Sequence, residues 1–230
     1  MMRNIDLNST KTLKIEGKSF YWASFFLPQN SKKNAGTLYS ICRYFDDIAD
    51  KKHEDQTKYF EDSIKDIKNN ENNTVNIFLN RNKIHKLIFI DLIEGLILDQ
   101  KNIKIQNTEE LINYSYHVAG TVGLMMSKII GVKDKKAARS AIDLGIGMQL
   151  TNIARDVYED AQMKRIYLPA SWIPNISLTY LKNSNVYNNE KDNEISSAIN
   201  KTINLSEKFY KNGFAGLKYI PFSTRLGIFI

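Results

Sequence analysis

The chain has 230 residues, of which 43% are hydrophobic and 25% are charged, values typical of an ordinary globular protein with a core of its own. Its formal net charge is +7, but no lysine- and arginine-rich block with interleaved aromatic residues occurs, which argues against a nucleic-acid-binding protein. Cys42 is the only cysteine, so an intrachain disulfide and a multi-cysteine metal site are excluded.

Neither a leader nor a membrane-spanning segment stands out in the sequence. Met1–Lys18 lacks the continuous apolar core of a signal peptide. The longest apolar run, Leu87–Leu98, is interrupted by Asp91 and Glu94 and is shorter than the about 20 residues that span a bilayer. We therefore expect a soluble or peripheral protein.

The predicted elements are helices throughout, because no sustained alternation and no Asn-Gly or Asp-Gly hairpin turn occurs. Apolar periodicity predicts helices at residues 30–50, within 51–80, and at 84–98, 111–130, 137–162 and 194–210. The Asn-rich stretches at 69–73 and 175–193 are predicted as loops. The expected fold class is all-α, with a single domain over residues 1–230.

The first predicted helix carries acids on its apolar side. Asp46 lies in the apolar stripe four residues after Cys42, and Asp50 follows one turn later. Arg43 lies one turn before Asp46 at the edge of the stripe. Such a pair by itself indicates a salt bridge to a neighbouring helix. A functional role for the two aspartates depends on whether a second acidic row faces them.

A second row of polar side chains lies in Met148–Asp160. Asn152, Asp156 and Asp160 are four residues apart, so on a helix they point the same way. The other faces are largely apolar, which is typical of a buried helix. Buried carboxylates cost on the order of several kcal/mol each unless a cation compensates. Two inward acidic rows therefore predict a cation held between them.

Oxygen ligands of this kind favour Mg²⁺ over zinc, with substrate phosphate oxygens completing its coordination. The matching chemistry is departure of a diphosphate, assisted by metal ions and by Arg43 and Arg155, which leaves a carbocation. Aromatic faces such as those of Phe20, Tyr39 and Tyr114 can stabilise that cation.

The predicted helix 111–130 contains two interior glycines, each costing about 1 kcal/mol against alanine. Two explanations remain open: close packing of a neighbouring helix, or room for a long ligand. His117 in the same helix is interpreted as a capping or packing residue, because no second histidine or cysteine stands at ligand spacing.

Three separated blocks of the sequence resemble the squalene/phytoene synthase family. They are Ser19–Asp50, Tyr114–Gly123 and Gln149–Trp172. Within the family, the last block looks most like bacterial phytoene synthases. The resemblance implies an isoprenoid-synthase-type helical bundle around a central cavity, with Mg²⁺ as cofactor, Mn²⁺ as its alternative, and no nicotinamide.

The family's functional residues carry over to matching positions of this chain. The resemblance implies metal binding by Asp46, Asp50, Asn152, Asp156 and Asp160. It implies contact with diphosphate, and assistance to its departure, for Tyr114, Arg43 and Arg155. It implies a substrate site lined by Ser19, Tyr39 and Gln149, and a prenyl tunnel bordered by Val118, Ala119, Val122 and Gly123.

The implied reaction joins two geranylgeranyl diphosphates through prephytoene diphosphate to phytoene. One alternative is squalene or dehydrosqualene formation from farnesyl diphosphate, and another is an inactive homologue that acts as a binding or assembly factor. Because the product is an insoluble hydrocarbon, we expect a cytoplasmic enzyme that contacts the inner face of the membrane peripherally. No pattern specifies an oligomeric state.

Two features depart from the family pattern. Lys164 stands where the family usually has glycine, just before Arg165. The chain also ends at Ile230, while family members usually continue through another helix with further active-site residues. We expect either a bundle shortened at its C-terminus or a partner that supplies the missing wall.

Overall fold

The computed structural model describes residues 22, 24–50, 55–100, 103–183 and 188–225. Within these residues every extended element is a helix, and only an isolated bridge between Lys104 and Ile166 has β-type pairing. The all-α prediction is confirmed. In the same part of the chain, no helix is both long and apolar enough to cross a membrane.

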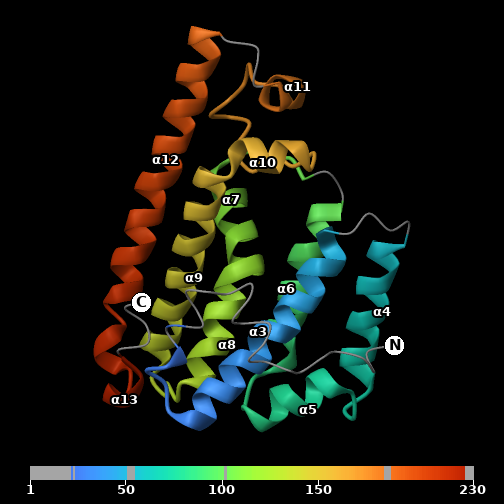
Figure 1. Cartoon of the computed structure of the whole chain (residues 1–230), viewed down its shortest axis with the longest axis vertical. Helices are drawn as coiled ribbons and strands as arrows, with labels where there is room; N and C mark the ends of the chain where they lie inside the picture. Colours follow the sequence, from blue (N-terminus) through green and yellow to red (C-terminus); the bar gives the residue numbers. More distant parts are fainter. Residues whose placement is uncertain (1–21, 23, 51–54, 101–102, 184–187, 226–230) are drawn as a thin grey trace.

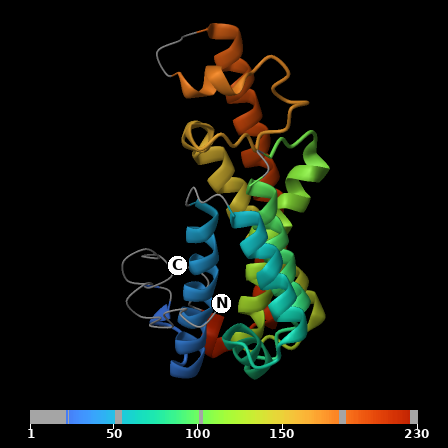
Figure 2. The same cartoon turned by 90° about the vertical axis from the view of Figure 1, so that its right-hand side faces the viewer.

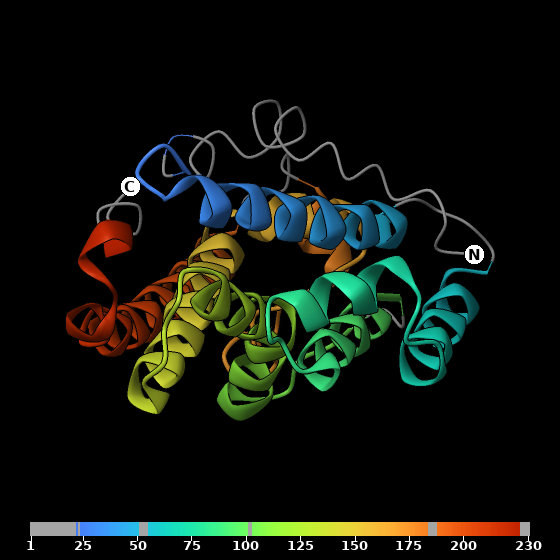
Figure 3. The same cartoon turned by 90° about the horizontal axis from the view of Figure 1, so that it is seen from below.

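The helices form a row with one helix laid across it. In chain order they are α3 (Gln29–Asp50), α4 (Gln56–Asn69), α5 (Thr74–Arg81), α6 (Lys86–Gln100), α7 (Thr108–Ser115), the π-helical turn η1 (Tyr116–Gly120), α8 (Thr121–Ile129), α9 (Lys135–Arg155), α10 (Val157–Gln162), α11 (Leu178–Lys182), α12 (Asn189–Phe214), the 3₁₀ turn η2 (Leu217–Tyr219) and α13 (Phe222–Arg225). In the row, α12 packs along α9, α9 along α8 and η1, and η1 along α6 (Figure 1). Helix α3 lies across one side and packs on α6 and α8 (Figure 3).

Two large apolar clusters and a small third one hold the described bundle together. In the first, the ring of Phe45 on α3 lies 6.4 Å from that of Phe60 on α4 and 5.4 Å from that of Phe89 on α6. The second joins α7, α9 and α12 through buried residues such as Leu150 and Ile195. Burial of each such side chain contributes about 1.5–3 kcal/mol. The N-terminal end of α12 lies with α10 and α11, and these three elements extend beyond the helices around α3 (Figure 2).

Helix α5 corrects the loop-like prediction for the end of segment 51–80. Asn73 begins this helix as its N-cap, and its side chain accepts a hydrogen bond from the Asn76 N–H at 2.7 Å. The Asn76 side chain in turn donates to the carbonyls of Ile67 and Asn70. The asparagines therefore stabilise the turn that joins α4 to α5.

The predicted helix 137–162 is wrong at one point, because α9 ends at Arg155 and α10 begins at Val157. Asp156 between them has φ −104° and ψ 17°. The backbone N–H of Asp156 still donates to the backbone carbonyl of Asn152 at 2.9 Å. The backbone N–H of Asp160 likewise donates to the backbone carbonyl of Asp156 at 2.8 Å. The break is thus a bend that keeps the four-residue spacing of the acidic row.

The C-terminal helices also differ from prediction. Helix α11 lies inside the expected loop 175–193, and α12 extends past both ends of the expected helix 194–210. Ser177 and Asn188 cap these helices, with side chains accepting from the backbone N–H groups of Tyr180 and Lys191. The prediction misses both caps because polar, Asn-rich sequence is equally typical of loops.

The predicted helix 111–130 contains the π-helical turn η1, where the Thr121 N–H donates to the Tyr116 carbonyl five residues back. Glycines in this region serve close packing. A Cβ on Gly123 would lie 2.1 Å from the Ala141 carbonyl oxygen, and one on Gly145 would lie 2.3 Å from that of Ala119. The first of the two explanations for these glycines therefore holds at Gly123.

Candidate active site

A cavity of about 240 Å³ lies between α3 and α9, and α6, α7, η1, α10 and the segment after α10 supply the other described parts of its wall. The described residues that line it are Arg43, Asp46, Ala49, Asp50, Leu96, Asp99, Tyr114, Val118, Gln149, Asn152, Ile153, Asp156, Asp160, Arg165 and Tyr167. All five positions of the two acidic rows are among them. Helices far apart in sequence thus bring the two rows to one space.

The α3 side of the cavity presents Asp46 and Asp50. Burial raises the pKa of Asp46 to about 7, an effect that the positive charge of Arg43 opposes. Asp50 is about half exposed, and its Oδ1 accepts a hydrogen bond from Nη1 of Arg165 at 3.0 Å. The first row is therefore held next to two arginines.

The α9–α10 side presents Asn152, Asp156 and Asp160. Asn152 is exposed and the two aspartates are half-buried, so this face is wetter than the buried helix we expected. Burial, and then the charge of Asp156, raise the pKa of Asp160 to about 7. Neutralisation by a cation would favour the ionised form of this carboxyl.

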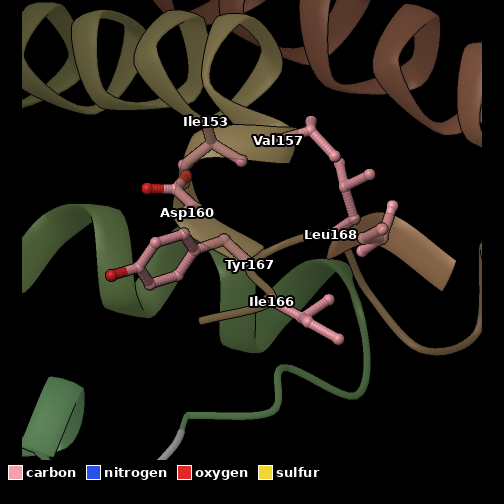
Figure 4. A pocket seen from close by; sticks show the side chains of 7 residues that line it. Ile153, Val157, Asp160, Ile166, Tyr167 and Leu168 are labelled. Carbon is pink, nitrogen blue, oxygen red and sulfur yellow. The ribbon is translucent and has the colours of Figure 1, made fainter. Parts of the chain in front are cut away.

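A void of about 10 Å³ lies behind Asp160, among apolar side chains of α9, α10 and the segment that follows. Figure 4 shows the oxygen-bearing ends of Asp160 and Tyr167 pointing to one side, away from Val157 and Leu168. The apolar packing therefore holds both polar groups toward the larger cavity, which they line.

The arginines predicted to contact diphosphate occupy different positions. Arg43 lines the cavity, with its Nε 2.9 Å from Oδ1 of Asp47. Arg155 does not occur among the described lining residues. Its side chain is 67% exposed and holds Asp156 through two hydrogen bonds of 2.6 Å. In this structure Arg155 orients an acid of the second row.

Of the predicted substrate-site residues, Val118 and Gln149 line the cavity. Tyr39, Ala119, Val122 and Gly123 do not occur in its described lining. Ser19, like Phe20 of the predicted aromatic set, lies outside the described residues. Three polar side chains of the described lining have no role predicted from the sequence, and these are Asp99, Arg165 and Tyr167.

Asp99 accepts hydrogen bonds from two tyrosines. The Tyr114 hydroxyl donates to its Oδ1 and Oδ2 at 3.0 and 3.1 Å, and the Tyr167 hydroxyl donates to Oδ1 at 2.8 Å. Burial is the main cause that raises the pKa of Asp99, and also the main cause that raises those of both tyrosines. In the sequence, Asp99 directly follows the predicted helix 84–98, and no spacing connects it to Tyr114 or Tyr167.

Lys164 occupies a position that suits glycine. Its φ is +66°, in the left-handed region, and it follows Met163, the C-cap of α10. The backbone N–H of Lys164 donates to the backbone carbonyl of Ala161, and the backbone N–H of Arg165 donates to the backbone carbonyl of Asp160. This pair of bonds is that of a Schellman motif. This turn aims Arg165 back toward α3.

The donor set suits a hard cation, since it consists of carboxylate and amide oxygens. Within the described residues, however, no three His, Cys, Asp or Glu side chains converge closely enough to hold a metal ion by themselves. The carboxylate and amide oxygens of the two rows would hold such a cation, and oxygens of a bound anion would supply its further ligands.

The all-α bundle with two acidic helices facing one cavity defines an enzyme of the prenyl-transferring class. A sequence model of the family described as squalene/phytoene synthase matches residues 13–230. The chain belongs to this family.

Individual relatives agree with this membership. The chain is 30% identical to a 15-cis-phytoene synthase of Enterobacter agglomerans, over 91% of this chain and 76% of the relative. It is 30% identical to a 15-cis-phytoene synthase of Pantoea ananas, over 93% of this chain and 74% of the relative.

Solved structures show the same fold. A dehydrosqualene synthase crystallised with a ligand superposes with a TM-score of 0.82 at 27% identity, over 96% of this chain and 79% of that one. A squalene synthase from Alicyclobacillus acidocaldarius superposes with a TM-score of 0.77 at 18% identity, over 99% and 91%. The isoprenoid-synthase helical bundle expected from the resemblance is confirmed, and the chain is short against several of these relatives.

Proposed function

We propose that this chain condenses two geranylgeranyl diphosphate molecules head to head, through prephytoene diphosphate, to phytoene with release of diphosphate. The observation that carries the proposal is the pair of acidic rows lining one cavity from opposite helices. The relatives named 15-cis-phytoene synthase, 30% identical over more than 90% of the chain, support the choice of substrate.

The proposed metal is Mg²⁺, with Mn²⁺ as its alternative, and no nicotinamide takes part. Asp46 and Asp50 would hold it from α3, and Asn152, Asp156 and Asp160 from the other side. When bound, the metal neutralises negative charge on the leaving diphosphate. Arg155 keeps Asp156 oriented for this role.

Other residues of this chain bind and shield the substrate. Arg43 and Arg165 line the cavity beside the acids and would bind diphosphate oxygens as charge-assisted donors. The apolar side chains of Leu96, Val118 and Ile153 cover part of the wall and would exclude water from the carbocation. Tyr114 would lie next to the reacting carbons.

A second candidate is dehydrosqualene or squalene formation from farnesyl diphosphate. It is favoured by the superposition with the dehydrosqualene synthase, at a TM-score of 0.82. The two candidates differ in the length of the prenyl chain that the protein accepts.

Product analysis tests the proposal. Purified protein with Mg²⁺ is offered geranylgeranyl and farnesyl diphosphate together, and hydrocarbons are extracted and identified by mass. We expect a C40 hydrocarbon, whereas a C30 product would establish the second candidate. Absence of both products and of their cyclopropyl intermediates would mean an inactive homologue with a binding or assembly role.

We further propose that the protein works in the cytoplasm in peripheral contact with the inner face of the membrane. The reason is chemical, since a C40 hydrocarbon must pass from the cavity into lipid. Sedimentation of the protein with vesicles, compared with a vesicle-free control, tests this placement.

A further inference from the structure

One carboxylate and two phenols form a connected group in the cavity wall. Asp99 comes from the end of α6, Tyr114 from α7, and Tyr167 from the segment after α10. Both hydroxyls donate to Asp99, at 2.8 to 3.1 Å. The two rings stack with their centroids 4.8 Å apart and their planes at 20°. All three residues line the cavity.

The direction of these hydrogen bonds decides what the phenols offer to a ligand. A tyrosine hydroxyl has one proton to donate and two lone pairs to accept with. While its proton is directed to Asp99, the hydroxyl of Tyr114 presents only lone pairs to the cavity, and the same holds for Tyr167. Neither hydroxyl can then donate to a diphosphate oxygen, and both are suited to face a positive charge.

We propose that Asp99 is a positioning residue that holds the hydroxyl protons of Tyr114 and Tyr167, so that both phenolic oxygens face the carbocation formed when diphosphate departs. The inference rests on the proposed function, since that chemistry generates the cation. It assigns Tyr114 to stabilisation of the cation and leaves the binding of diphosphate to the arginines and the metal.

A second aspartate–tyrosine bond, between α6 and η1, offers a matched control. Asp91, two turns before Asp99 on α6, accepts a hydrogen bond from the hydroxyl of Tyr116 at 3.0 Å. Neither Asp91 nor Tyr116 is among the described residues that line the cavity. Asp91→Asn therefore changes a similar aspartate–tyrosine bond, between α6 and η1, outside the described lining of the cavity.

The kinetic test compares Asp99→Asn, Tyr114→Phe, their double variant and Asp91→Asn, in the full chain with Mg²⁺ and geranylgeranyl diphosphate. We expect Asp99→Asn to lower kcat about 10- to 100-fold, the effect of losing a hydrogen bond to a charged group, with KM nearly unchanged. The double variant should lose less than the product of the single losses, because both remove the same bond. Asp91→Asn should retain the wild-type kcat.

Binding of inorganic diphosphate with Mg²⁺, measured by calorimetry, separates positioning from binding. We expect Asp99→Asn to bind it like the wild type. A binding loss as large as the loss in kcat, an unchanged kcat, or strictly multiplicative single losses would each overturn the proposal. If circular dichroism shows that Asp99→Asn is unfolded, Tyr167→Phe replaces it, and a wild-type kcat in that variant overturns the proposal.

A readout independent of turnover comes from NMR of protein labelled with ¹³C at the tyrosine Cζ atoms, which report hydroxyl hydrogen bonding. Asp99→Asn should shift the signals of Tyr114 and Tyr167 and leave that of Tyr116, and Asp91→Asn should do the reverse. Unmoved Tyr114 and Tyr167 signals overturn the inference. A wild type that forms no hydrocarbon from either diphosphate overturns the proposed function instead, so the two failures are distinguishable.

Discussion

Arg165 joins Asp50 across the cavity: its Nη1 donates to Oδ1 of Asp50 at 3.0 Å, and its Nη2 donates to the Ala49 carbonyl at 3.3 Å. Only 12% of the Arg165 side chain is exposed, so its charge acts in a poorly solvated space. The end of α3 and the segment after α10 are thereby connected, although they are separated by 115 residues.

Replacing this charge should change the titration of the neighbouring acids. Burial raises the pKa values of Asp99 and Asp160, and Arg165 lowers both. We expect Arg165→Met to move the pKa of Asp160 above 7 and the pH dependence of Mg²⁺ binding to higher pH, with activity at pH 7 about 10-fold lower. Calorimetric Mg²⁺ titrations from about pH 6 to 9 measure the shift.

Arg139→Met on α9 is the control, because the exposed Arg139 side chain pairs with Asp143 and is not in the described lining. A profile of Arg165→Met that superposes on the wild type would refute the assigned coupling.

The metal-free protein should lose stability as pH rises from about 4 to 7. The folded-state pKa of Asp46 is about 7, far above the value of about 3.9 expected when unfolded, so in this window the native state binds more protons than the unfolded state. The stabilisation is complete below the unfolded pKa and is lost as pH rises through the folded one. Urea denaturation without metal, at several values between about pH 5 and 8, measures it.

Asp46→Asn removes this titration, and its free energy of unfolding should fall less steeply with pH than that of the wild type. At about pH 8, Mg²⁺ should restore stability to the wild type and stabilise the Asp46→Asn variant less, because the variant lacks one of the proposed metal ligands. Equal slopes for the two proteins would show that Asp46 does not titrate in this window.

Glycine at position 164 should stabilise the fold. A left-handed conformation costs a non-glycine residue roughly 1 kcal/mol, which Lys164 bears at φ +66°. We expect Lys164→Gly to raise the free energy of unfolding by about 0.5–1 kcal/mol in denaturant titrations. Lys83, with φ +56° at the end of α5, is a matched site remote from the cavity, where Lys83→Gly should give a similar gain. A loss of stability in both variants would contradict the explanation.

Alanine at position 123 should disrupt the contact between α8 and α9. Its Cβ would lie 2.1 Å from the Ala141 carbonyl oxygen, which belongs to the backbone and can move only with its helix. We expect Gly123→Ala to destabilise by about 2 kcal/mol or more in thermal denaturation. Gly147→Ala is the milder comparison, since its Cβ would lie 3.3 Å from the Ser206 carbonyl oxygen. Equal stabilities of the two variants would be inconsistent with this packing.

Asp156→Ala should reduce turnover at least about 10³-fold, because the variant lacks a carboxylate of the proposed metal site. Far-ultraviolet circular dichroism should remain that of the wild type. Glu159→Gln, an exposed neighbour on α10, should retain activity. A wild-type rate for Asp156→Ala would remove the metal assignment of the second row.

Local sequence pattern was sufficient for the longer helices and for the spacing within both acidic rows, because apolar periodicity and four-residue spacing are properties of a single helix, but it missed the short helices α5 and α11. Asp99 and Tyr167 could not be found in this way, since their partner Tyr114 lies on a different element and no spacing connects the three. The bend at Asp156 occurs without proline or glycine, so no local signal marked it. Arg165 was visible in its motif, but its direction depends on the left-handed turn at Lys164.

The π-helical turn η1 changes the direction in which side chains point between α7 and α8, which are otherwise continuous. Before it, Tyr114 bonds to Asp99 on α6, and after it, Gly123 rests against Ala141 on α9. Because such a turn accommodates an additional residue, shortening η1 by one residue would rotate α8 by about 100° relative to α7. The number of residues between Tyr114 and Gly123 is therefore set by contacts at both ends, and single-residue insertions or deletions there should be rejected even where substitutions are tolerated.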